Sequence, residues 1–419
     1  MLDNCGVGLV NVTAAMRTPI RPQTRWARDA EYFEVQEQYP SQVTRRYLVV
    51  ANSYDGSSYA TDSALYEWSG GQLSEVTPSP FQNTKGAHHW KHFVMGGAHY
   101  LVVANHYDDG GNGYGSPSVI YKFAWSSALS AYTFTPVQSI STAGAAAWEA
   151  FDVGEDTYLA VANYFNGSHF DVNSKVFKLA RTDPDTPLPR VVSVQSIPTS
   201  GARCVEAFQI GGIQHLAYGN RRGGDIKVYR WDATAGSFAL WDTIISRQVL
   251  SLDSFTRGGK VYLAAANLAR AGPGSSSDTS AVWYHDPATM SGFAKLQDLT
   301  SGEGSDIKHF THAGDDWLAV ASLPDGRSAN GSSQLHRWSG GAFWPVFDLP
   351  TDSAYALAFF TVPCDTTASD GLPCGQRATE DLIFAANGGG VGSQLFRLED
   401  AYLSLEATHA EFTSSGPGD

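Results

Sequence analysis

Positive charge is scarce in this sequence. Its 419 residues include 28 Lys or Arg against 42 Asp or Glu, which gives a formal net charge of −14. Such a surface repels the phosphates of nucleic acids and of anionic lipids. Long apolar runs are also missing, since no segment approaches the roughly 18 uninterrupted apolar residues of a membrane helix. We therefore expect no nucleic-acid partner and no membrane insertion.

Cysteine is sparse as well. Four cysteines are too few for a scaffold of several disulfides. Cys364 and Cys374 bracket a turn-rich segment, CDTTASDGLPC, and this spacing predicts a disulfide between them. Cys204 stands in an apolar strand pattern typical of a buried thiol, and Cys5 has no evident partner. The N-terminal stretch MLDNCGVGLVNVTAAM lacks the basic and apolar regions of a secretion signal, so we expect none within this chain.

One strand motif, by contrast, is repeated seven times. Its third copy reads YLAVAN, and similar strands recur at intervals of 47 to 65 residues. These spacings exceed those of helical repeats and lie near those of propeller blades. The chain also contains 42 Gly, 19 Tyr and 21 Phe, a composition that favours strands and turns. The seven copies end at Asn52, Asn105, Asn163, Asn220, Asn267, Ser322 and Asn387.

Each copy belongs to a unit of four strands. In the third copy, GAAAWEAFDV precedes the motif, and SKVFKL and VVSVQSI follow it. A single blade leaves two apolar faces uncovered, and a closed ring covers them. We therefore predict an all-β, seven-bladed β-propeller of four-stranded antiparallel blades at residues 26–406. Residues 1–25 would form an N-terminal segment in which GVGLVNV could close the seventh blade, and residues 407–419 a flexible C-terminal tail.

The repeats resemble the epitempin (EPTP or EAR) family, found in the propeller of the leucine-rich glioma-inactivated proteins. The most specific stretch is QSISTAGAAAWEAFDVGEDTYLAVANYFNGS. The resemblance implies a secreted or cell-surface propeller that binds or scaffolds another extracellular protein, or a glycan, and that has no catalytic activity. It does not identify the partner, and an alternative is a building block of an extracellular filament or coat.

Two sets of residues are candidates for a site. Along the innermost strands, one aligned position carries charges that could hold Ca²⁺ or could pair between neighbouring blades, while no cofactor is required. The acidic members are Glu31, Glu149, Glu206 and Asp253, and the same position carries Lys91 and Lys308 in two other blades. In the loops after the repeated strands, aromatic and acidic side chains could contact a partner. These loop residues are Tyr54, Asp55, Tyr59, Tyr107, Asp108, Asp109, Tyr114, Tyr164 and Phe165.

Three further predictions concern modification, metal and catalysis. Sequons at Asn11, Asn166 and Asn330 are candidate glycosylation sites, although Asn-Gly-Ser is also ordinary turn chemistry. Five histidines crowd the second blade, where packing between blades competes with zinc binding. No hydrolase, phosphate-loop or dinucleotide motif is present, so we expect no enzyme. The rival is a polysaccharide lyase or hydrolase in the channel mouth, with a grouping such as His88, Tyr218 and Arg221.

Overall fold

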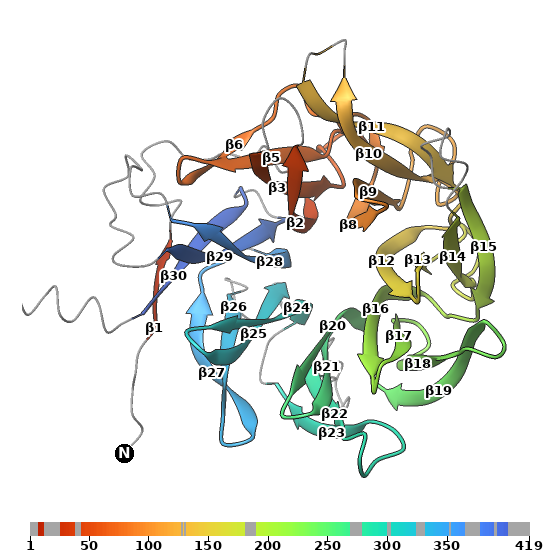
Figure 1. Cartoon of the computed structure of the whole chain (residues 1–419), viewed down its shortest axis with the longest axis vertical. Coiled ribbons are helices and arrows are strands. Elements are labelled where there is room, and N and C mark those ends of the chain that lie inside the picture. The colour runs from red at the N-terminus through yellow and green to blue at the C-terminus, as the bar shows by residue number, and fades with distance from the viewer. Residues whose placement is uncertain are drawn as a thin grey trace, which may run out of the picture.

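A computed structural model shows seven four-stranded antiparallel sheets arranged as blades around a central axis (Figure 1). This confirms the predicted seven-bladed propeller. The described residues contain no helix that is long and apolar enough to cross a membrane. The structure describes residues 7–11, 26–37, 43–126, 129, 131–180, 190–268, 279–299, 303–323, 332–351, 353–364, 378–388 and 392–400.

The innermost strand of each blade lines the axis. In chain order these are β2 (Ala27–Glu37), β8 (Ala87–Met95), β12 (Ala145–Val153), β16 (Ala202–Ile210), β20 (Val249–Arg257), β24 (Glu303–His312) and β28 (Ala354–Pro363). The repeated motif forms the second strands, β3 (Val43–Asn52), β9 (Ala98–Asn105), β13 (Asp156–Asn163), β17 (Ile213–Asn220), β21 (Lys260–Asn267), β25 (Asp315–Leu323) and β29 (Thr379–Asn387). The motif is apolar throughout because both faces of a second strand are covered by neighbouring blades.

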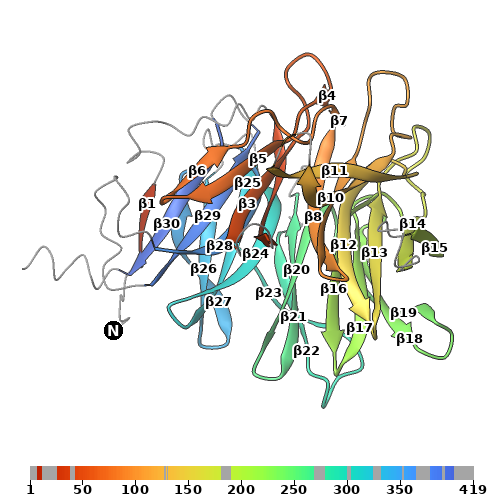
Figure 2. The ribbon, with the colours of Figure 1, turned by 45° about the horizontal axis from the view of Figure 1, so that its top comes forward.

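The outer half of each blade is more exposed. The third strands are β5 (Ala64–Ser69), β10 (Ser118–Ser126), β14 (Ser174–Ala180), β18 (Asp225–Asp232), β22 (Ala281–His285), β26 (Ser333–Ser339) and β30 (Gln394–Asp400). The fourth are β6 (Gln72–Glu75), β11 (Ala131–Ile140), β15 (Arg190–Ile197), β19 (Ser237–Ile245), β23 (Ala294–Asp298), β27 (Ala342–Leu349) and β1 (Val7–Asn11). A small ribbon of β4 (Ala60–Thr61) and β7 (Thr84–Lys85) stands beyond the sheets (Figure 2).

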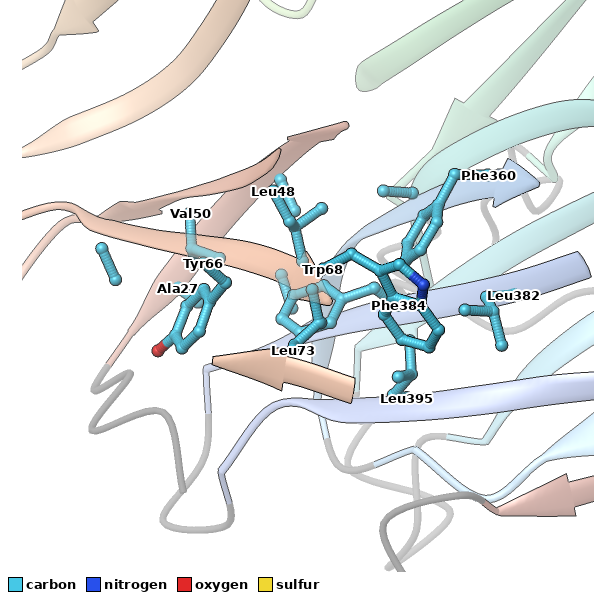
Figure 3. Close-up of a cluster of buried hydrophobic side chains, with 14 of the residues drawn as sticks. Ala27, Leu48, Val50, Tyr66, Trp68, Leu73, Phe360, Leu382, Phe384 and Leu395 are labelled. Carbon is cyan, nitrogen blue, oxygen red and sulfur yellow. The ribbon is translucent and has the colours of Figure 1, made fainter. Parts of the chain in front are cut away.

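The ring closes between the two ends of the chain. Strand β1 pairs antiparallel with β30, from Val7 opposite Asp400 to Asn11 opposite Phe396, so the N-terminal segment forms the outer edge of the seventh blade. Blades one and seven then share one buried cluster. In Figure 3, Leu48 and Trp68 of the first blade lie near Phe360 and Phe384 of the seventh. The apolar faces of the terminal blades are thereby removed from water.

The recurring Asn at the end of the second strand ties two loops together. The Asn163 side chain donates to the carbonyl of Asn173 at 2.9 Å and accepts from the amide of Ala143 at 3.1 Å. The Asn105 side chain does the same with Pro117 and Lys85. The residue keeps the backbone of a strand, and its side-chain amide satisfies loop groups on both sides.

Candidate functional site

Every innermost strand begins with a β-bulge. The register of each first pair of strands shifts by one residue near its start. A bulge leaves an extra residue unpaired and redirects its side chain. The seven extra residues all line a central cavity of about 510 Å³. We call them the bulge ring: Arg28, His88, Ala146, Arg203, Leu250, Ser305 and Tyr355.

Two arginines dominate the bulge ring. Arg203 of β16 donates from Nη1 to Nδ1 of His88 in β8, at 3.2 Å. Its guanidinium also lies 5.1 Å from the ring centre of Tyr164, while that of Arg28 lies 3.9 Å from the ring centre of Tyr355. Burial lowers the pKa of Arg28, and burial together with repulsion from Arg28 and Arg221 lowers the pKa of Arg203 to about 10. Several cationic groups thus crowd this end of the channel.

The histidines beside the arginines are neutral. His88 stacks on His106 with ring centres 3.8 Å apart, and His106 contacts the carbonyl of Ala145 through Nδ1 at 3.1 Å. Burial, followed by the nearby histidine and arginine charges, lowers the pKa of both imidazoles, that of His106 to about 3. Elsewhere in blade two, His92 packs on Phe33. These histidines therefore contribute to packing between blades, and in the described residues no three potential ligands converge as a zinc site would require.

A second ring, three residues further along the innermost strands, is mainly acidic. It contains the predicted Glu31, Glu149, Glu206 and Asp253 with Lys91 and Lys308, and all six line the same cavity. The charges pair across blades, since Lys91 Nζ of blade two lies 3.0 Å from Glu149 Oε1 of blade three. No three carboxylate, imidazole or thiol groups converge as metal ligands in the described parts of the chain. Of the two interpretations, the arrangement favours pairing between blades over Ca²⁺ binding.

Glu206 is the acidic residue with the least compensation. Burial first, then the charges of Asp253 and Glu149, raises its pKa to about 8. Burial also raises the pKa of Asp253 and of Asp29 to about 6. Ser254 donates to Glu206 at 2.8 Å, but neither lysine pairs with it directly. Glu206 is thus largely protonated at neutral pH, and this adds to the argument against a hard-cation site.

On the face around the bulge ring, aromatic side chains form one continuous row. We call this row the aromatic arc: Tyr54, Tyr59, Tyr107, Tyr114, Phe165 and Phe170. Successive ring centres are 4.8, 5.0, 4.9, 4.8 and 4.5 Å apart, a spacing typical of favourable aromatic pairs. Beyond Phe170, the guanidinium of Arg222 lies 4.3 Å from the ring centre and continues the row onto blade four.

The arc is built by the repeat. Two residues after the terminal Asn of blades one to three stands an aromatic side chain, and a second follows in the same loop. The second ring contacts the next blade, as Tyr59 contacts Tyr107 and Tyr114 contacts Phe165. The residue directly after the Asn points inward instead, so His106 and Tyr164 connect the arc to the bulge ring. Because successive side chains after the strand end point in opposite directions, the aromatic arc and the bulge ring form one continuous surface.

Glycines fix the contacts within the arc. Gly86 and Gly144 precede their innermost strands with φ of 53° and 54°, and their amides donate to the carbonyls of Tyr59 and Tyr114 at 2.7 and 2.5 Å. A Cβ at Gly144 would lie 2.6 Å from the Phe165 carbonyl oxygen. No side chain fits there without moving the loop.

The acidic loop residues hold the arc in shape. Asp55 accepts from the amides of Ser57 and Ser58, and Asp108 accepts from the amide of Gly110 at 2.9 Å. Asp109 reaches from blade two to the amide of Tyr59 in blade one at 3.2 Å. Asx turns of this kind satisfy loop backbone locally. The three carboxylates therefore support the loops that carry the arc.

The structure brings the predicted aromatic residues together but buries them more than expected. Tyr59 is 36% exposed, the other members of the arc are half-buried, and Tyr164 is buried. His88 and Arg221 do line one cavity. Tyr218, however, lies fully buried in the packing between blades three and four, so the catalytic grouping with His88 and Arg221 is wrong.

The predicted modifications remain predictions. Asn166 is exposed beside Phe165, with its Oδ1 accepting from the amides of Ser168 and His169. Asn330 lies outside the described residues, and Asn11 ends β1. Cys204 is a free buried thiol, whereas Cys364 is not free. Cys374, the partner predicted for Cys364, also lies outside the described residues, as does Cys5.

Comparisons with known proteins agree with the repeats. A family model described as the EPTP domain matches residues 80–123, 133–178, 192–232 and 237–280. The human and mouse proteins named "thrombospondin-type laminin G domain and EAR repeat-containing protein" are both 32% identical to the chain, over 300 and 310 residues. Each match covers 69% of this chain but 42% of the relative, so the chain spans less than half of those proteins.

Two solved structures share the fold. A protein from Lactobacillus plantarum has a TM-score of 0.53 and 13% identity, covering 84% of this chain and 98% of its own. The periplasmic gluconolactonase of Pseudomonas aeruginosa has a TM-score of 0.52 and 18% identity, covering 85% of this chain and 96% of its own. At such low identity the likeness concerns the fold alone.

Proposed function

This chain is an EPTP-repeat protein, and from that premise we propose that it is a binding module, not an enzyme, that recognises another protein outside the cell. The face with the aromatic arc is the proposed contact surface. The observation that carries the proposal is the continuous row of rings from Tyr54 to Phe170. Aromatic side chains supply large, rigid contact areas, and they are enriched at protein interfaces.

Further observations support this surface. The arc is pre-organised by Gly86, Gly144 and the inter-blade bond from Tyr59 to Asp109, so little ordering cost would fall on binding. The extracellular location rests on the relatives, whose name joins EAR repeats with a thrombospondin-type laminin G domain. A glycan at exposed Asn166 would stand beside Phe165 and restrict which partners reach that end of the arc.

Binding to an array of cell-surface and secreted proteins tests the proposal. We expect the wild-type propeller to bind a partner, and Tyr107→Ala and Phe165→Ala to weaken that binding at least tenfold. Trp344→Ala is the matched control, because Trp344 is 60% exposed on the outer strand β27, away from the arc. Unchanged binding by both arc variants would reject the proposed surface. Loss of binding or self-association in Trp344→Ala alone would favour the building-block alternative, in which outer blade edges make lateral contacts.

A further inference from the structure

The bulge ring has an unusual charge balance. Arg28 comes from blade one and Arg203 from blade four, and no acidic side chain belongs to the ring. Neither arginine forms an ion pair within the described residues, and Nε of each is buried without a hydrogen-bond partner. Buried arginine donors normally meet an acceptor, because leaving one unmet costs about 1–3 kcal/mol or more.

Nearby groups partner other atoms of the two guanidinium groups and leave both Nε atoms unpaired. Arg28 has a side-chain hydrogen bond with Tyr355, and Arg203 donates from Nη1 to His88, but neither partner is a carboxylate. Asp29 accepts instead from the amide of Trp90 at 2.7 Å. Glu303 lines the same cavity but is engaged in an interaction of its own. The imbalance is therefore local to the bulge ring.

The imidazole of His88, beside Arg203, can also donate a hydrogen bond. Because Arg203 donates to Nδ1 of His88, that nitrogen is the acceptor of the neutral ring, and its hydrogen resides on Nε2. His106 packs flat against His88 and holds it in place. Guanidinium groups match carboxylate, sulfate and phosphate oxygens in a fork geometry that lysine lacks.

We infer that Arg28 and Arg203 bind an oxyanion at the mouth of the channel, and that the partner proposed above supplies it as an acidic side chain. The inference deepens the proposed function by naming the chemistry of the partner group. An acidic side chain entering here would be flanked by Tyr164 and Tyr355, while the rest of the partner would lie on the arc. A free inorganic oxyanion is the other source of the same chemistry.

Isothermal titration of the propeller alone tests the site without any partner. The probes are sodium sulfate and N-acetylglutamate amide, each titrated against sodium chloride at equal ionic strength. We expect both to bind wild type, and Arg28→Gln and Arg203→Gln to weaken binding at least tenfold. The affinity of Arg203→Lys should lie between those of wild type and Arg203→Gln, because lysine keeps the positive charge but lacks the forked guanidinium donors. Arg222→Gln is the matched control, since Arg222 lies on the same face but does not line the cavity.

A second readout guards against variants that fold poorly. Oxyanion binding to wild type should raise the pKa of the His88 imidazole, because a nearby negative charge favours the protonated ring. NMR titration of the imidazole measures this change. Binding of sulfate but not of the glutamate derivative would assign the site to a free ion and overturn the partner side chain. No binding of either probe, or equal loss in Arg222→Gln, would overturn the site itself. Failure of the arc variants alone would leave these titrations unaffected, so the two proposals fail separately.

Discussion

Blades one to three and blades five to seven differ in the sequences that follow their second strands. After the second strands of blades one to three the loops read SYDGSSYATDS, HYDDGGNGYGSPS and YFNGSHFDVN, each with at least two aromatic residues. The corresponding loops of blades five to seven, LARAGPGSSSDTS, LPDGRSANGS and GGGVGS, contain none. The strands beneath are near copies. One repeat can therefore maintain the ring while only some of its copies carry aromatic loops.

The backbone just before the innermost strands follows a different division of the blades. This position has a left-handed φ in both halves, 54° at Gly144 and 56° at Gln248. Glycine occurs at this position in blades two to four, where a Cβ would strike residues of the adjoining loop. In blades one, five and seven the position is taken by Trp26, Gln248 and Ser353, with φ of 59°, 56° and 57°. The close approach of the loop, rather than the φ angle or the aromatic residues themselves, therefore requires the glycine.

Replacing that glycine should have the largest effect. Gly144→Ala places a Cβ at a left-handed position, 2.6 Å from the Phe165 carbonyl oxygen, and should lower the free energy of unfolding by about 3 kcal/mol. Urea unfolding measures the change. Gln248→Gly is the matched control and should alter stability by less than about 1 kcal/mol. Similar losses of unfolding free energy in Gly144→Ala and Gln248→Gly would contradict the conclusion that the nearby loop makes glycine necessary at Gly144 but not at Gln248.

The sequence predicted the ring because its information is periodic. Seven apolar motifs with similar spacing fix the blades, and Glu31 and Glu206 of the aligned position in the innermost strands line the central cavity. The segment GVGLVNV was recognised as a candidate closing strand, and β1 lies at that edge. These features depend on patterns that local sequence carries.

The bulge ring was missed for a geometric reason. In a regular strand, side chains three residues apart point to opposite faces, so the pattern predicts Arg28 and Glu31 on opposite sides of β2. The bulge between Ala27 and Asp29 shifts this phase, and nothing in single-residue patterns marks it. The alignment that contains the acidic position also contains the position three residues earlier, which carries Arg28, His88 and Arg203. This group of basic residue types is the sequence feature that could have revealed the bulge ring. The loop aromatics were predicted, but their interleaving between blades depends on the assembled ring.

The terminal Asn offers a second, smaller test of the division. Asn163→Ser in blade three removes two hydrogen bonds that join loops supporting the arc, and should cost about 2 kcal/mol. Blade six carries Ser322 at this position, and its hydroxyl is buried without a hydrogen-bond partner in the described structure. Ser322→Ala should therefore cost less than about 0.5 kcal/mol by thermal unfolding. A larger loss at Ser322 than at Asn163 would contradict this assignment.

Glu206 lies at the boundary between the two halves and provides a pH-dependent test. Because its pKa is raised to about 8 in the folded state, from an ordinary value of about 4.5, the folded protein holds this proton more tightly than the unfolded chain. Its unfavourable contribution therefore grows as pH rises from about 4.5 to 8. Glu206→Gln should stabilise the fold by about 1–2 kcal/mol at pH 8 and hardly at all at pH 4.5.

The control for Glu206 is its neighbour on the aromatic side. Glu149 pairs with Lys91 at 3.0 Å, so Glu149→Gln removes the direct partner of a half-buried lysine and should destabilise at pH 8. At pH 8 the two substitutions should change the unfolding free energy in opposite directions. A loss of stability in Glu206→Gln at pH 8 would contradict the raised pKa of Glu206.

The smallest expected effect lies where the arc ends. Arg222 closes the row of rings by stacking on Phe170, and a cation–π contact at such a partly exposed site contributes about 0.5–1 kcal/mol. Arg222→Gln should therefore lower the unfolding free energy by about 0.5 kcal/mol, whereas Arg222→Lys should lose less because the cation is kept. Since Arg222 is on blade four, partner binding by Arg222→Gln also measures how far the contact surface extends. Binding equal to that of wild type would show that the contact surface ends at Phe170. A severalfold loss of binding would show that it extends onto the fourth blade.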